Sequence, residues 1–165
     1  MNTPFLDEIY QRVDFDRELV FKFFIVFSLF EYSLKRGGFL TRGQSGEAQP
    51  DWKGFANSIH PQFDPQATPE MGTAVNYMLN RPVMKQIPSN NNLVYTQRQR
   101  PQNMNDTEWL SVLIRGVRNN LFHGGKFRYA RPRDPDLITN SLVVLETWAQ
   151  LQPDVERELR NAEQP

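Results

Sequence analysis

The sequence predicts an all-α fold, a helical bundle of about five helices in one domain covering residues 1–165. Three observations predict it: apolar residues recur at helical spacing, capping residues precede those stretches, and glycine or proline follows them. A chain of 165 residues can bury a single core. Hydrophobic residues make up 39% and 12 residues are phenylalanine, so we expect an aromatic-rich core.

The longest expected helix covers residues 16–36. Asp14 or Asp16 can cap its start, and Gly37-Gly38 can end it. It is apolar on nearly every side, through Leu19, Val20, Phe21, Phe23, Phe24, Ile25, Val26, Phe27, Leu29 and Phe30. Such a helix belongs at the centre of a bundle or in a subunit interface.

The middle of the chain alternates between expected loops and short helices. Residues 37–50 contain four glycines and predict a loop, followed by a short helix at about 51–60. Thr68-Pro69 has the pattern of a helix start and predicts a helix to about Leu79.

A long irregular loop is expected at about residues 81–105, which are polar and rich in proline and asparagine. Connections of this length are usually functional or disordered. Residues 83–87 and 93–96 could alternatively pair as a short hairpin around the asparagine run.

Two long helices are expected in the last third of the chain. Residues 105–108 open the first, whose apolar residues recur at helical spacing, and Gly124-Gly125 ends it. Asp134-Pro135 starts the second. From Pro153 onward we expect a short, charged helical tail that frays at its end.

Composition excludes several classes of chemistry. Cysteine is absent, which removes disulfide frameworks, thiolate nucleophiles and cysteine-ligated zinc. The N-terminus lacks the basic and apolar regions of a signal peptide. The most apolar stretch, Leu19–Leu34, contains Lys22 and Glu31 and is shorter than a membrane span needs. We therefore expect a cytoplasmic protein with no membrane partner.

The net charge of zero hides an uneven distribution. Residues 1–80 carry a net charge of −3, residues 81–133 carry +8 and residues 134–165 carry −5. A basic middle between acidic flanks suggests a local anion-binding site. The alternative is that the acidic flanks neutralise the middle in the folded protein.

The segment that carries chemistry runs from Arg115 to Lys126. Arg115, Asn119 and His123 are spaced by four residues, so they lie on one ridge of a helix, with Arg118 beside it. Carbonyl groups at the helix end favour the charged form of His123, whereas the nearby arginines oppose it, so its pKa can lie near neutrality. Arginine suits phosphate because it stays charged and binds two oxygens at once.

This combination of side chains suggests cleavage of RNA without a metal ion or other cofactor. The 2′-hydroxyl is an internal nucleophile, so the protein need supply only proton transfer and charge stabilisation. The segment holds no carboxylate and the chain has only two histidines, which argues against a metal site. One histidine cannot easily act as both acid and base, and a symmetric homodimer would supply a second.

Several residues have a structural interpretation as well as a functional one. His123 could simply cap carbonyl groups, and the arginines could be solvated or paired with Glu108 or Glu146. Glu31 could pair with an arginine in the core or position Arg118 in a site. The basic segment after the motif could contact RNA through Lys126, Arg128 and Tyr129, with Arg131 and Arg133 nearby, or be a plain solvated loop.

Arg118-Asn119-Asn120-Leu121-Phe122-His123 resembles the R-x4-6-H motif of the HEPN superfamily, the nucleotide-binding domains of higher eukaryotes and prokaryotes. The resemblance covers about residues 16–36 and 106–150. It implies an all-α, usually dimeric fold. It also implies that Arg118 and His123 are catalytic, that Asn119 is their polar companion, and that Glu31 is the acid some families place in an early helix.

The same resemblance implies a function. Many HEPN proteins are metal-independent endoribonucleases of toxin–antitoxin or anti-phage systems, leaving a 2′,3′-cyclic phosphate and a 5′-hydroxyl. The expected partners are therefore RNA, a second copy of the chain and a cognate antitoxin protein. Two alternatives remain: a non-catalytic HEPN module that binds RNA, a nucleotide or a protein, and a structural helical protein in which the motif is coincidental.

Overall fold

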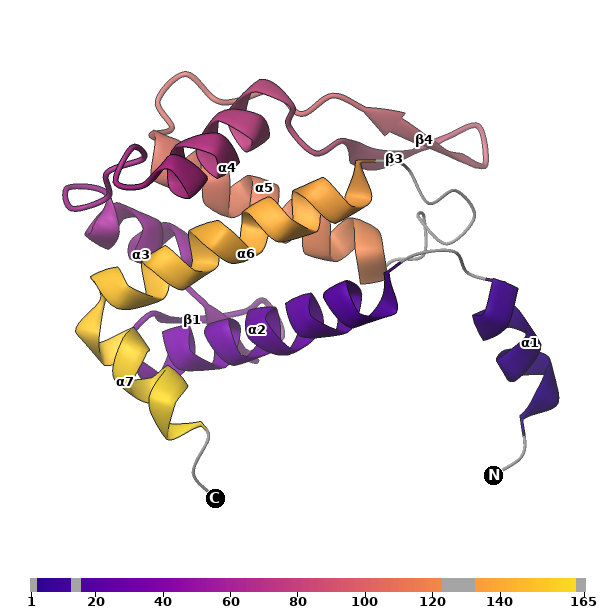
Figure 1. The fold of residues 1–165 in the computed structure, drawn as a ribbon, viewed down its shortest axis with the longest axis horizontal. Coiled ribbons are helices and arrows are strands. Elements are labelled where there is room, and N and C mark those ends of the chain that lie inside the picture. Colours follow the sequence, from indigo (N-terminus) through magenta and orange to yellow (C-terminus); the bar gives the residue numbers. More distant parts are fainter. Residues whose placement is uncertain (1–2, 13–15, 123–132, 163–165) are drawn as a thin grey trace.

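The computed structural model describes residues 3–12, 16–122 and 133–162, and it is mostly helical. The described part contains seven helices and two β-hairpins (Figure 1). The helices are α1 (Pro4–Arg12), α2 (Arg17–Arg36), α3 (Trp52–Ile59), α4 (Pro69–Asn80), α5 (Asp106–Phe122), α6 (Asp134–Leu151) and α7 (Pro153–Asn161). The strands are β1 (Leu40–Arg42), β2 (Ala48–Pro50), β3 (Lys85–Ser89) and β4 (Asn92–Thr96).

The helical class is confirmed, but the expectation of about five helices with little sheet was too simple. α1 was not expected, and the charged tail forms a separate helix, α7. α7 is docked on the bundle, because it packs on α2 and α6 and Val155 is fully buried. A salt bridge of 3.3 Å between Arg36 Nε and Glu158 Oε2 joins it to the end of α2.

Helix starts follow the predicted caps. The Asp16 carboxylate accepts a hydrogen bond of 2.9 Å from the Leu19 amide at the start of α2. The Thr68 hydroxyl accepts one of 3.1 Å from the Met71 amide at the start of α4. Each bond satisfies a backbone N–H that has no partner inside the helix.

The two segments predicted as loops each contain a hairpin. β1 pairs antiparallel with β2 within the glycine-rich residues 37–50. β3 pairs antiparallel with β4 within residues 81–105, which corrects the irregular loop and confirms the alternative of a hairpin around the asparagines. Asn90 and Asn91 form its two-residue turn, both with positive φ, a conformation that asparagine tolerates better than most residues.

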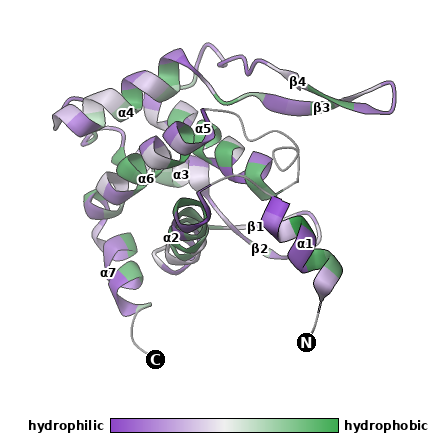
Figure 2. Ribbon diagram, turned by 45° about the vertical axis from the view of Figure 1, so that its right-hand side comes forward, coloured by the Kyte–Doolittle hydropathy of each residue, from purple (hydrophilic) through white to green (hydrophobic). Residues whose placement is uncertain are grey.

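An aromatic core joins α2, α3 and α6. The Trp52 indole stacks on Phe27 and Phe30, with ring centroids 5.5 and 5.4 Å apart, and Phe55 meets Trp148 at 6.0 Å. The expected aromatic core is therefore confirmed. Figure 2 shows hydrophobic residues along α2, α4, α5 and α6, and also on α1.

α2 is only half enclosed by the bundle. Phe23, Phe27, Phe30 and Leu34 are at most 3% exposed. The opposite side of the helix presents Phe21, Phe24, Ile25 and Tyr32 to solvent, and Phe21 is 65% exposed. Within the described ranges, no helix is long and apolar enough to cross a membrane.

Candidate functional site

α5 carries the part of the predicted motif that the structure describes. The Asn105 side chain caps the helix by accepting a hydrogen bond of 2.8 Å from the Glu108 amide. One face of the helix is buried in the core through Leu110, Leu113, Ile114, Val117 and Leu121. Arg115 and Asn119 are exposed on the other side, as their spacing predicted.

Arg118 is held at the junction of α5 and α2. Its guanidinium lies 5.7 Å from the ring centroids of both Phe27 and Phe122 and is half-buried. It donates a hydrogen bond of 3.0 Å to Asn119 Oδ1. No ion pair involves Arg118 among residues 3–12, 16–122 and 133–162. Cation–π contacts orient the guanidinium without neutralising its charge, so Arg118 is suited to bind an anion.

Asn119 has a specific place beside that guanidinium. Because its carbonyl oxygen accepts the bond from Arg118, the amide nitrogen at the other end of the side chain remains available as a donor. The side chain is exposed, so this donor faces solvent. The pair thus presents a cation and a neutral donor side by side.

The rest of the predicted catalytic and RNA-contacting set falls outside the described residues. His123 directly follows Phe122, the last residue of α5, and lies outside them. Lys126, Arg128 and Tyr129 also lie outside them. In the sequence, residues 123–132 include Lys126, Arg128 and Arg131 and no carboxylate.

Glu31 has a partner that sequence reasoning did not name. Its Oε1 accepts a hydrogen bond of 3.0 Å from the Trp52 indole nitrogen. It forms no ion pair with Arg118 in the part of the chain that the structure describes. Glu31 follows Phe27 by one helical turn of α2. Its observed contact is therefore a structural one that fixes the indole in the aromatic core.

The arginines do not use the carboxylates considered as alternatives. Neither Arg115 nor Arg118 is paired with Glu108 or Glu146 in the described ranges. Glu108 instead accepts a hydrogen bond of 3.2 Å from Asn57 on α3. Arg133 donates a bond of 2.6 Å to the Arg81 carbonyl at the end of α4, which ties it to the fold.

Arg98 is a residue of this region that sequence reasoning missed. It follows β4 and lies against Gly116, where a Cβ would come within 2.9 Å of its Nη2 and 3.1 Å of its Nε. Burial, and then the charge of Arg115, lower the pKa of Arg98 below its ordinary value. The available signal was Gly116 itself, because glycine inside a helix often marks a close approach by another group.

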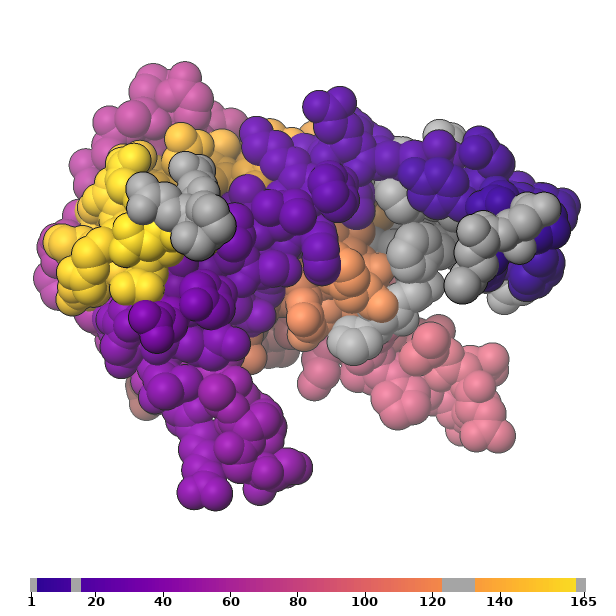
Figure 3. Space-filling model, turned by 90° about the horizontal axis from the view of Figure 1, so that it is seen from below, coloured from indigo at the N-terminus to yellow at the C-terminus, as the bar shows by residue number. Residues whose placement is uncertain are grey.

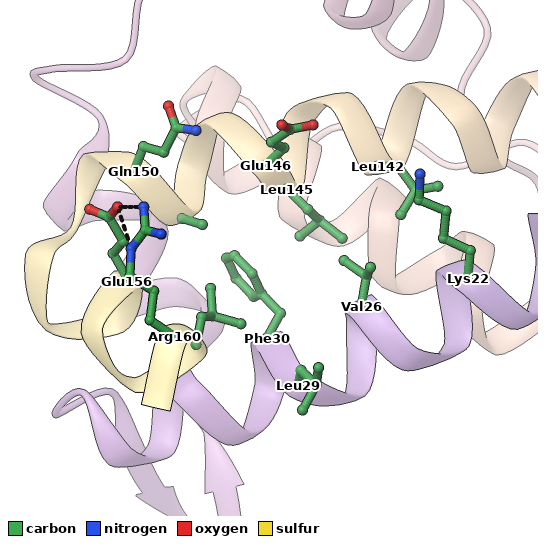
Figure 4. A pocket seen from close by; sticks show the side chains of 12 residues that line it. Lys22, Val26, Leu29, Phe30, Leu142, Leu145, Glu146, Gln150, Glu156 and Arg160 are labelled. Atoms are coloured by element: carbon green, nitrogen blue, oxygen red, sulfur yellow. Dashed lines mark hydrogen bonds and ion pairs between the residues drawn. The ribbon is translucent and has the colours of Figure 1, made fainter. Parts of the chain in front are cut away.

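Two clefts border the helices. One, of about 370 Å³, lies beside α5 and is lined by Lys53, Pro101, Asn103, Met104, Glu108, Ser111, Val112 and Arg115. The other, of about 350 Å³, lies between α2, α6 and α7 (Figure 4). Its floor is apolar, and the Glu156–Arg160 ion pair stands at its rim. Of these two clefts, the first contains a residue of the predicted motif segment, Arg115. A smaller cleft of about 40 Å³ is lined by Asn120, another residue of that segment.

Similarity to known proteins does not identify the site. No protein-family model, curated protein or solved structure matches the chain. Among the described residues, no group of three or more His, Cys, Asp or Glu side chains could hold a metal ion. The HEPN resemblance therefore depends on the motif residues alone.

Proposed function

We propose that the protein is a metal-independent endoribonuclease of the HEPN type, acting as a toxin or an anti-phage defence effector. The observation that carries the proposal is the arrangement of Arg118 and Asn119 at the end of α5. The Arg118 guanidinium is held by two aromatic rings and has no ion pair among the described residues, and the Asn119 amide donor lies beside it. In the sequence, these two residues stand five and four positions before His123. These groups suit a phosphodiester whose negative charge increases during reaction.

In the proposed reaction, the 2′-oxygen of a ribose attacks the adjacent phosphorus and the bond to the 5′-oxygen breaks. The 2′-hydroxyl proton leaves to a base and a proton is delivered to the 5′-oxygen, giving a 2′,3′-cyclic phosphate and a 5′-hydroxyl. His123 carries one proton transfer and the His123 of a second copy carries the other. Arg118 stabilises the additional charge on the phosphate oxygens, and Asn119 donates to one of them.

A homodimer is part of the proposal, and the exposed side of α2 supports it. The Phe24 ring lies 5.4 Å from the Phe122 ring, so this apolar side is continuous with the end of α5. An interface built there would place two copies of the motif near one another. Large apolar side chains gathered on one exposed face are typical of protein interfaces.

The first test is RNA cleavage in EDTA by the wild type and by His123→Ala. We expect the wild type to cut single-stranded RNA and to leave a cyclic phosphate end, and the variant to lose cleavage at least a hundredfold. His60→Ala is the matched control, because His60 is the other histidine and is exposed at the end of α3. Equal cleavage by wild type and His123→Ala would refute the assignment.

The biological role has a separate readout. Induced expression of the wild type should arrest the growth of a bacterial host, and His123→Ala should not. Rescue of growth by a protein that co-purifies with the wild type would identify the expected antitoxin. If the purified protein binds RNA but neither cuts it nor arrests growth, the non-catalytic binding module becomes the better description.

A further inference from the structure

Two arginines, Arg98 and Arg115, come to neighbouring positions of α5 beside the motif. Arg98 reaches α5 at Gly116, the residue directly after Arg115, and the charge of Arg115 contributes to lowering the Arg98 pKa. Arg98 is half-buried, so water screens this repulsion less than it would at an open surface. Two like charges held close together lower the stability of the free protein. Such an arrangement is therefore expected to serve a function, such as binding an anion.

No carboxylate of the described residues forms an ion pair with either arginine. Residues 123–132 contain no acidic side chain that could do so. Arg98 Nε is buried without a hydrogen-bond partner among the described residues. A phosphate ion could satisfy the N–H donor of Arg98 and offset the charge of both arginines, since each guanidinium can bind two of its oxygens.

A cleft of suitable size adjoins Arg115. Arg115 lines the cleft of about 370 Å³ beside α5, together with Lys53 from α3. Its wall is a turn that Arg100 holds in place by donating two hydrogen bonds, of 3.0 and 2.7 Å, to the Met104 carbonyl and by pairing with Asp106 at 2.6 Å. The cleft is therefore built by a fixed turn on one side and by α5 on the other.

The lining of the cleft combines apolar and polar groups. Pro101, Met104 and Val112 give apolar surface, while Asn103 and Ser111 add polar groups. The Glu108 carboxylate also lines the cleft and accepts a hydrogen bond from Asn57. Its negative charge favours the uncharged nucleoside, and not the phosphate, inside the cleft. A cavity of a few hundred cubic ångströms with apolar walls and a few polar groups is typical of sites for small organic groups such as a nucleoside.

We propose that Arg98 and Arg115 bind a backbone phosphate and that the adjoining cleft accepts the neighbouring nucleoside. This nucleotide subsite lies next to Arg118 and Asn119 along α5, so it would hold the strand beside the scissile bond. The choice of RNA as ligand depends on the proposed function, whereas the binding of a nucleoside phosphate does not. Arg98 is a binding residue in this proposal and takes no part in proton transfer.

RNA binding tests the phosphate contacts in proteins that all carry His123→Ala, so that cleavage plays no part. The probe is a fluorescent single-stranded RNA of mixed sequence, titrated by anisotropy at several salt concentrations. Arg98→Gln and Arg115→Gln should each weaken binding about tenfold and lower the slope of log Kd against log salt by about one. Arg42→Gln, at an exposed position on β1, is the matched control and should change neither quantity.

Nucleoside monophosphates test the cleft. Adenosine or uridine monophosphate should shift the NMR amide signals of Met104 and Val112 in the wild type and should not do so in Arg115→Gln. Inorganic phosphate should shift the Arg98 and Arg115 side-chain signals and leave Met104 unchanged. Because Arg115 is exposed, its variant is expected to fold normally, which circular dichroism can verify.

Failure of the subsite and failure of the ribonuclease proposal give different results. If Arg98→Gln and Arg115→Gln bind RNA as Arg42→Gln does, or if no nucleoside monophosphate reaches Met104, the subsite is wrong even where the wild type cuts RNA. If the monophosphates bind through Arg115 but the wild type does not cut RNA, the subsite stands and the ribonuclease proposal fails.

Discussion

At the residue scale, Gly116 sets how closely Arg98 and Val83 can approach α5. A Cβ at this position would come within 2.8 Å of Val83 Cγ1, which belongs to the buried core, as well as meeting the Arg98 guanidinium. A glycine inside a helix usually costs stability relative to alanine. Its presence in the middle of α5 therefore has a packing reason.

We expect Gly116→Ala to lower the free energy of unfolding by about 1–3 kcal/mol, because the added methyl group forces apart side chains that are already packed. Urea denaturation followed by circular dichroism would measure it. Gly72→Ala in α4 is the matched control, since its Cβ would meet only the end of the Gln66 side chain, which can rotate away. That variant should be as stable as the wild type or more stable by up to about 1 kcal/mol. A Gly116→Ala protein that is no less stable than the wild type would disprove the close packing.

Single residues also show what the sequence could and could not predict about the site. Arg115 and Asn119 are exposed on one ridge because helical spacing alone decides which residues share a face. Arg98 could not be found that way, because it reaches α5 from a segment beyond a hairpin. The contact between Glu31 and Trp52 likewise joins residues from two helices and has no signature in local sequence.

At the element scale, α7 shows how a charged segment can be part of the core. Most of its side chains are charged, which suggested a fraying tail. Its spacing nevertheless brings Val155 to the inner side, where it is fully buried beside Gly37. One buried side chain and the contact with α2 are enough to place the helix.

Val155→Ala should therefore lower the free energy of unfolding by about 2 kcal/mol, through lost apolar burial and the cavity left behind. Arg157→Ala, on the same helix but 59% exposed, is the control and should change it by less than about 0.5 kcal/mol. Thermal and urea unfolding would give both values. Equal stability of the two variants would mean that α7 frays as the sequence suggested.

Local sequence signals predicted some elements well and others poorly. The capped helix α2 and the Thr68-Pro69 start of α4 were predicted because caps act within a few residues. β1 and β2 have only three residues each, too few to show an alternating pattern. α1 was missed although Thr3-Pro4 repeats the start signal of α4. No residue of α1 is buried, so packing in the core does not explain this helix.

At the scale of the whole molecule, the chain leaves apolar surface without a described partner. Figure 3 shows the outer side of α2, with α1 projecting to one side. α1 exposes Phe5, Leu6, Ile9 and Tyr10 by 45–70%. Its described polar contact with α2 is at Arg17, which donates a hydrogen bond of 2.9 Å to the Tyr10 carbonyl and lies over the Tyr10 ring. Surfaces of this composition are stabilised by association.

We expect the wild type to be a dimer through this side of α2 and Phe21→Glu to be a monomer, because a charge in the interface would lose its water on association. Light scattering after size exclusion would measure the mass. Leu93→Glu is the matched control: Leu93 is 66% exposed, as Phe21 is at 65%, but it lies in the β3–β4 hairpin. Leu93→Glu should remain dimeric and active.

The same pair of variants connects association to catalysis. If two copies of His123 share the proton transfers, the monomeric Phe21→Glu protein should lose RNA cleavage while keeping the helix content of the wild type. Cleavage per protomer in the wild type should then rise with protein concentration across the dimerisation range. A monomeric Phe21→Glu that still cuts RNA at the wild-type rate would show that one motif suffices, and the shared-histidine mechanism would have to be replaced by one within a single chain.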